Sequence, residues 1–331
     1  MYKKFFHLHR NPFEITPDPA FLFPTKKHND ALVALYYGVR QHKGFVVLTG
    51  EVGTGKTLLV RCLLHLLKGT NVGYAYVFNS VLSPLEFLQY ISGDLGLPIS
   101  GKSKSELLLS LYNYLIERHK KKLTTVLVID EAHHLSSEVL EEVRLLTNLE
   151  TSQEKLLQIL LVGQPELDDK LDSFELRQLK QRIALRSEIQ PLTLHETEEY
   201  IHRRLQLAGA NLDTDDVFAN NVIAFVHRHS RGIPRIINTI CESALITAYA
   251  KQIRMITPDI IEEIAIDLRL RLVSPSPRTG QANSFQASPF NEDLLGAIRT
   301  LLQLHDTLKA RTGQVDIEAG QFTGVKHEPF I

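Results

Sequence analysis

The sequence of 331 residues predicts an α/β fold, in which a five-stranded parallel sheet is flanked by helices and followed by a four-helix domain. Between residues 45 and 192, short runs of Val, Ile and Leu alternate with segments of helical periodicity. Such alternation is typical of parallel βαβ units whose strands are covered on both faces. After Pro191 the strand patterns largely stop and helical patterns follow. The length suits about two domains.

The expected strands are short apolar runs bounded by Gly, Lys or Asp. They are Phe45–Leu48, Val72–Phe78, Val126–Ile129 and Leu156–Val162, and a last strand at about Leu185–Ile189 would complete five. Apolar residues repeated every three or four positions predict helices between them, at Lys56–Leu67, Pro84–Leu95, Ser105–Lys121 and Ser137–Leu149. One helix, about Asn29 to Gln41, precedes the first strand. Four more follow the last strand, at His195–Ala208, Asp215–His229, Pro234–Ala250 and Pro258–Leu270.

These patterns predict five segments with different roles. In order they are an amino-terminal arm and helix (1–44), an α/β domain (45–192), a helical lid domain (193–272), a linker (273–290) and a carboxyl-terminal amphipathic helix with a tail (291–331). The arm is expected to be irregular, because its prolines favour turns. The linker is rich in Ser, Pro, Gln and Asn.

Charge and cysteine content exclude several functional classes. Lys and Arg total 37 against 38 for Asp and Glu, so a generic basic coat for nucleic acid is excluded, although a local patch could still bind phosphates. Cys62 and Cys241 cannot form a disulfide framework and fit a reducing, cytosolic compartment. No segment resembles a signal peptide or a membrane span, so we expect any membrane association to be peripheral.

The strongest motif is a phosphate-binding loop (P-loop). Residues 50–57 fit G-x-x-x-x-G-K-[ST], directly after an expected strand and opening an expected helix. Glycines let backbone N–H groups curl around phosphates, Lys56 adds a positive charge, and the Thr57 hydroxyl can bind Mg²⁺. The residues expected to hold ATP are Gly50, Glu51, Val52, Gly53, Thr54, Gly55, Lys56, Thr57 and Leu58.

Two carboxylates end the third expected strand, as in a Walker B motif. Asp130 is expected to hold Mg²⁺ and to belong to the nucleotide site, and Glu131 to orient or deprotonate the attacking water. The letters Asp130-Glu131-Ala132-His133 also spell a DEAH box. A helicase of that class requires further motifs and a second RecA-like domain, which the sequence lacks, so we interpret the spelling as coincidental.

Further polar residues are placed to assist the reaction. Gln164, at the tip of the fourth strand, can hydrogen-bond the γ-phosphate or the water. Arg177, Arg182 and Arg186 precede or flank the fifth strand, where an arginine can reach a neighbouring subunit's nucleotide. We favour Arg182 for this role. Arg235 opens a lid helix and can reach back to the γ-phosphate.

Together these motifs resemble the AAA+ ATPases over roughly residues 1–270. Several segments are similar, more narrowly, to the ExeA/GspA group: Asn11–Phe13 with Thr16–Pro19, Gly50–Leu59, Leu161–Leu167, Gln178–Ile183 and Gly232–Asn238. Within the group, the P-loop looks most like that of the MshM branch, which serves MSHA pilus biogenesis.

The resemblance implies an ATPase that works as a homo-oligomeric ring with ATP and Mg²⁺. It implies Gln164 as sensor 1, Arg235 as sensor 2 and Arg182 as the arginine acting in trans. It also implies partners in type II secretion or pilus assembly at the inner membrane, and therefore a cytoplasmic protein, peripheral at that membrane. Secretion members add a membrane span and a peptidoglycan-binding domain; we expect neither in this chain and favour the pilus reading.

Two other functions stay open from the sequence alone. One is an ATP-dependent DNA-binding regulator, since the transposition ATPases TnsC and TniB have a similar core; the charge balance and the lack of a helix-turn-helix disfavour it. The other is a nucleotide-gated scaffold that hydrolyses ATP too slowly to do mechanical work.

Overall fold

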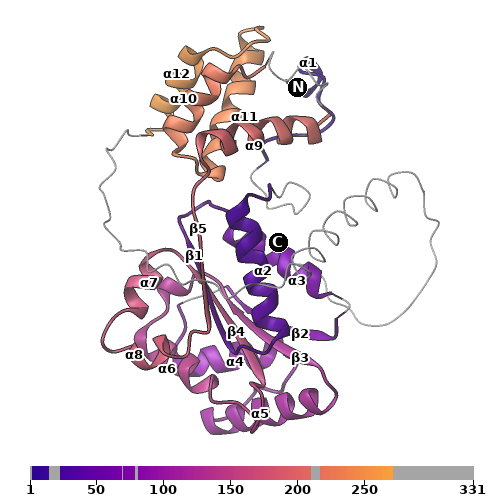
Figure 1. Cartoon of the computed structure of the whole chain (residues 1–331), viewed down its shortest axis with the longest axis vertical. Coiled ribbons are helices and arrows are strands. Elements are labelled where there is room, and N and C mark those ends of the chain that lie inside the picture. The colour runs from indigo at the N-terminus through magenta and orange to yellow at the C-terminus, as the bar shows by residue number, and fades with distance from the viewer. Residues whose placement is uncertain (1, 15–22, 69, 79–80, 210–216, 271–331) are drawn as a thin grey trace, which may run out of the picture. The chain divides into compact units, whose positions relative to one another are not determined.

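The computed structural model describes residues 2–14, 23–68, 70–78, 81–209 and 217–270 (Figure 1). The expected linker and carboxyl-terminal helix lie outside these residues, as does the expected start of the second lid helix at Asp215.

The five-stranded parallel sheet is confirmed. Its strands are β1 (Phe45–Gly50), β2 (Val72–Val77), β3 (Thr124–Ile129), β4 (Leu157–Gly163) and β5 (Leu185–Ile189). All neighbouring strands pair in parallel, in the order β2-β3-β4-β1-β5 (Figure 1). The carboxyl ends of β3, β4 and β1 therefore lie side by side at one edge of the sheet.

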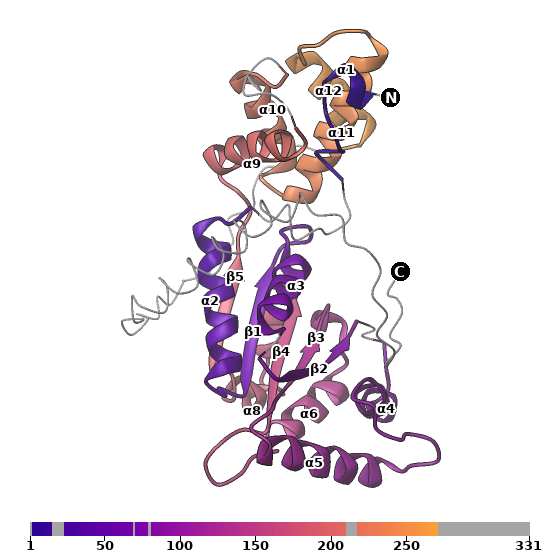
Figure 2. The same ribbon diagram turned by 90° about the vertical axis from the view of Figure 1, so that its right-hand side faces the viewer.

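Helices cover both faces of the sheet, which explains why the central strands β1, β3 and β4 are largely apolar and buried. On one face lie α2 (Lys26–Arg40) and α3 (Lys56–Leu67); on the other lie α4 (Pro84–Asp94), α5 (Lys104–Lys120) and α6 (Ser137–Leu146) (Figure 2). Alternate residues of β1 divide between the two cores, with Val46 and Leu48 facing α2 and α3 and with Phe45 and Val47 facing the other layer. The short helices α7 (Glu166–Leu171) and α8 (Arg177–Lys180) extend the second layer.

Polar side chains start several of these helices. Ser83, Ser103 and Thr193 each accept a hydrogen bond from a backbone N–H three residues later, and a Glu at that position bonds back to the cap. Such capping boxes satisfy N–H groups that lack a partner in the helix.

The helical domain contains α9 (Leu194–Leu207), α10 (Asn220–Ser230), α11 (Pro234–Ala250) and α12 (Pro258–Asp267) around one apolar core. Among the described residues, no helix is long and apolar enough to span a bilayer.

The amino-terminal segment differs from the irregular arm that the sequence predicts. Tyr2–Phe5 form a short helix, α1, and the side chains of Phe6, Leu8 and Phe13 are buried in the core of the helical domain. The backbone N–H of His9 donates to the carbonyl oxygen of Ala208 at 2.7 Å. Residues 2–13 thus pack with the helical domain, whereas α2 packs on the sheet, so the stretch 1–44 does not act as one unit.

Phe13 should contribute strongly to stability, because its side chain is fully buried and packs edge-to-face against Phe218 with ring centroids 6.0 Å apart. We expect Phe13→Ala to lower the free energy of unfolding by about 3–5 kcal/mol, from lost burial and the cavity left behind. Urea unfolding measures this. The matched control is Phe174→Ala, at a side chain that is 78% exposed, and equal losses in the two variants would contradict the packing.

Candidate nucleotide-binding site

The sheet order brings the predicted site residues to one edge. The P-loop follows β1, Asp130 and Glu131 follow β3, and Gln164 follows β4. Since β4 lies between β3 and β1, the three loops are neighbours, as expected for the ligand-binding edge of an open α/β sheet.

The P-loop curls around the ammonium group of Lys56. Its Nζ atom donates to the carbonyl oxygens of Gly50 at 2.7 Å and Glu51 at 3.0 Å, and the side chain is buried. Burial lowers the pKa of Lys56, while the nearby charges of Glu131 and Asp130 oppose this shift. The α3 helix begins at Lys56, so its positive end points into the loop. This arrangement suits an anion.

Glycines allow two close approaches around the start of α11, and one of them is to the P-loop. Gly53 has φ +80°, and a Cβ there would lie 2.7 Å from the Cβ of Arg235, whose backbone N–H donates to the Gly53 oxygen at 3.2 Å. Gly232 has φ +71°, and a Cβ there would lie 1.9 Å from the oxygen of Leu192. The first turn of α11 is thereby docked on the P-loop, and Arg235 lies beside it, as the sequence predicts.

A set of oxygen atoms meets at Asp130. Its Oδ2 atom accepts hydrogen bonds from the hydroxyls of Thr57 at 2.9 Å and Tyr76 at 2.8 Å, and its Oδ1 atom accepts one from the backbone N–H of Glu131. Burial and the Asp130 charge raise the pKa of Tyr76, which therefore stays a neutral donor. A hydroxyl and a carboxylate are hard oxygen donors of the kind that Mg²⁺ binds alongside phosphate and water. The residues thus fit Mg²⁺, although the described chain contains no cluster of three His, Cys, Asp or Glu side chains.

Glu131 has a left-handed backbone, φ +50°, at the turn after β3. Its Oε2 atom is buried and accepts no hydrogen bond within the described structure. The Nδ1 atom of His133 lies 3.5 Å from this oxygen and accepts a hydrogen bond from the backbone N–H of Gln164 at 3.3 Å. An unpaired carboxylate is available as a proton acceptor.

The three candidate arginines lie in different surroundings. The Arg186 guanidinium pairs with Asp168 at 2.9 Å, and that of Arg177 stacks on Phe174, 4.2 Å from the ring centroid. Arg182 is exposed and precedes β5 at the edge where the strands begin, away from the P-loop of its own chain. Among the described residues no hydrogen bond of its guanidinium is found.

The sequence interpretation missed two contacts at the site. His28, buried in α2, has Nε2 3.0 Å from the Thr54 oxygen and Nδ1 2.7 Å from the Thr25 hydroxyl. A carbonyl oxygen only accepts, so Nε2 carries the proton and Thr25 donates to Nδ1. Tyr76, described above, is the second. The position of Tyr76 could have been predicted from the sequence, because it lies at the end of a strand that neighbours the Walker B strand.

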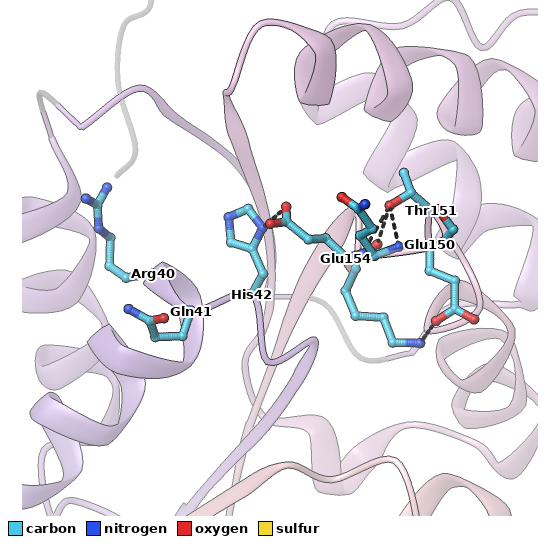
Figure 3. A pocket seen from close by; sticks show the side chains of 9 residues that line it. Arg40, Gln41, His42, Glu150, Thr151 and Glu154 are labelled. Carbon is cyan, nitrogen blue, oxygen red and sulfur yellow. Dashed lines mark hydrogen bonds and ion pairs between the residues drawn. The ribbon is translucent and has the colours of Figure 1, made fainter.

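A second hollow of about 610 Å³ lies at the opposite edge, where β1 and β4 begin. Arg40 and Gln41 extend from the end of α2 on one side, and the hairpin before β4 forms the other (Figure 3). Most of its charges are already paired, including His42 with Glu154 at 3.1 Å. This hollow lacks the phosphate-binding loop and the acidic pair, which lie at the other edge of the sheet.

Fold and site together define a class of protein, the P-loop nucleotide-binding proteins. The model of the AAA domain family matches residues 39–171, which include the P-loop and the acidic pair after β3. The chain is also 43% identical over 252 residues to general secretion pathway protein A of Aeromonas hydrophila, which supports membership of the ExeA/GspA group. This match covers 76% of the chain and 45% of that protein, so the chain spans less than half the length of this relative.

Solved structures with the same fold include proteins of the ORC and Cdc6 type. The ORC2 protein of Aeropyrum pernix with ADPNP and ADP has a TM-score of 0.57 at 18% identity, with 78% of this chain and 71% of that chain covered. Cdc6p of Pyrobaculum aerophilum has a TM-score of 0.59 at 19% identity, covering 77% and 70%. Drosophila ORC bound to DNA has a TM-score of 0.60 at 19% identity, covering 78% and 65%. These likenesses establish the fold.

His28 makes stability depend on pH. Burial lowers the pKa of His28 below its ordinary value of about 6.5, because protonation would charge a buried ring, and the bond to the Thr54 oxygen only partly opposes this shift. Below about pH 6.5 the unfolded chain takes up a proton that the folded chain does not, so stability is present above this pH and is lost as the pH falls towards the folded pKa. The slope is up to about 1.4 kcal/mol per pH unit.

We expect His28→Gln to flatten this dependence relative to the parent. Urea unfolding at pH 7.5, 6.5 and 5.5 measures it. His195→Gln, at a ring that is 79% exposed, is the control and should keep the slope of the parent. Equal slopes in the parent and His28→Gln would show that His28 is not the group responsible.

Proposed function

We propose that this protein binds ATP with Mg²⁺ at the P-loop edge and hydrolyses it. The observation that carries the proposal is the hydrogen bond between Thr57 and Asp130, which joins the P-loop to the Walker B strand. Backbone N–H groups at the start of α3 bind the phosphates, and Lys56 exchanges its carbonyl partners for phosphate oxygens.

The remaining residues act on the water and the γ-phosphate. Glu131 accepts a proton from the attacking water, and Gln164 holds the water or the γ-phosphate through its amide. Thr57 and Asp130 would hold Mg²⁺, which neutralises charge on the phosphates when bound. Arg235 reaches the γ-phosphate from the helical domain, whose backbone already contacts Gly53.

We further propose the biological setting: assembly of an envelope machine, either type II secretion or an MSHA-like type IV pilus. The identity of 43% to general secretion pathway protein A supports it. In this setting the chain works as a homo-oligomeric ring, with Arg182 reaching the nucleotide of the neighbouring subunit, and it meets its partners at the cytoplasmic face of the inner membrane.

Two substitutions test the reaction. Lys56→Ala should lose nucleotide binding and hydrolysis, because the charge at the phosphates is removed. Glu131→Gln should keep ATP affinity and hydrolyse about 10²- to 10⁴-fold more slowly, the usual range for loss of a general base. Phosphate release measures hydrolysis, and a fluorescent ATP analogue measures nucleotide binding.

Lys121→Ala and Glu138→Gln are the matched controls, because both side chains are exposed and lie away from the P-loop. They should behave as the parent does. Hydrolysis by Lys56→Ala at the rate of the parent would overturn the proposed site.

A further inference from the structure

One nitrogen of His133 faces two different partners. Its Nδ1 atom lies 3.3 Å from the backbone nitrogen of Gln164 and 3.5 Å from Oε2 of Glu131. The side chain is only 6% exposed, and its Nε2 atom is buried without a hydrogen bond in the described part of the chain. The ring therefore bridges the tip of β4 and the acid that follows β3.

The two contacts exclude each other. A peptide N–H only donates, so the bond from Gln164 requires a lone pair on Nδ1, and the proton of the neutral ring is then on Nε2. In this form the ring has nothing to donate to Glu131. In the other neutral tautomer the proton is on Nδ1, which can donate to the Glu131 carboxylate but can no longer accept from Gln164.

The surroundings of the ring hold it between these partners. The Nζ atom of Lys170 donates to the oxygens of His133 and Leu135, both at 2.7 Å, which anchors the turn after β3. The ring of His134 lies against that of His133, with centroids 3.9 Å apart. Burial lowers the pKa of His133, and the charges that act on it include Glu166 of α7 as well as Glu131 and Lys56. The ring is thus neutral, and the tautomer decides which contact forms.

We infer that His133 is a positioning residue that couples the sensor strand to the catalytic acid. While the N–H of Gln164 occupies Nδ1, the Glu131 carboxylate stays unpaired and can accept the proton of water. In this arrangement the ring holds the tip of β4, which carries Gln164, in place beside Glu131. His133 thereby positions Gln164 relative to Glu131 and leaves the carboxylate free of a hydrogen bond from the ring. This inference rests on the proposed hydrolysis.

Substitutions that keep or remove the acceptor test the coupling. His133→Leu fills similar space without an acceptor, and His133→Gln restores an amide oxygen that can accept from Gln164. We expect His133→Leu to lower kcat about 10- to 100-fold, the usual effect of losing a partner that orients a functional group, with KM and the affinity for a fluorescent ATP analogue within about twofold of the parent. His133→Gln should recover most of kcat. His134→Ala, next in the same turn and exposed, should keep kcat within about twofold.

Several results would overturn the inference. They are a kcat of His133→Leu equal to that of the parent, a rise in KM at constant kcat, no recovery in His133→Gln, or an equal loss in His134→Ala, which would assign the effect to ring packing. Circular dichroism checks folding, and His133→Ala takes the place of His133→Leu if the latter does not fold. Hydrolysis by the parent and its loss in Glu131→Gln are measured in the same series. If both hold while His133→Leu keeps kcat, the coupling fails and the proposed function stands; if the parent does not hydrolyse ATP, both fail.

Discussion

The hydrogen bond from the Thr57 hydroxyl to Asp130 is the interaction on which the account of this protein depends. It joins the first turn of α3 to the end of β3, although β4 separates β3 from β1 in the sheet. This is possible because the parallel register brings all three strands to the same edge, with Thr49 opposite Gly163 and Ile129 opposite Leu161. Sheet order and register thus bring Lys56, the two acids and Gln164 to one edge of the sheet.

The P-loop is held from two sides by residues outside it. On one side, His28 of α2 bonds the oxygen of Thr54; on the other, the backbone N–H of Arg235 bonds the oxygen of Gly53. Both contacts use carbonyl oxygens of the loop, and neither occupies one of its N–H groups. The second contact links the P-loop to the helical domain, so a movement of α11 would displace Gly53. The amino-terminal segment extends this link, because Phe13 packs in the core of the helical domain.

Much of the fold could be predicted from sequence, because it depends on local patterns. The α3 helix and β5 have the predicted bounds, since a P-loop starts the helix and the strand patterns end at Pro191. The packing of Phe13 on Phe218 could not be predicted, because the two are joined only by tertiary contacts. The same holds at the site. Strand ends indicated Asp130 and Gln164. The role of His28 could not be predicted, because it depends on how α2 packs against the P-loop, and the spacing of apolar residues in α2 does not determine that. His133 was visible in the sequence, but its contact with Gln164 arises only from strand order.

The identity of the nucleotide retained by Glu131→Gln tests most directly whether the Thr57–Asp130 edge binds ATP and Glu131 activates the water. The variant is mixed with ATP and Mg²⁺, separated from free nucleotide on a desalting column, and the bound nucleotide is identified by chromatography. If the Thr57–Asp130 edge holds ATP and Glu131 activates the water, the bound nucleotide is ATP, close to one per chain, and is absent when Lys56→Ala is added. Retention of ADP in place of ATP, or equal retention with Lys56→Ala, would contradict the account.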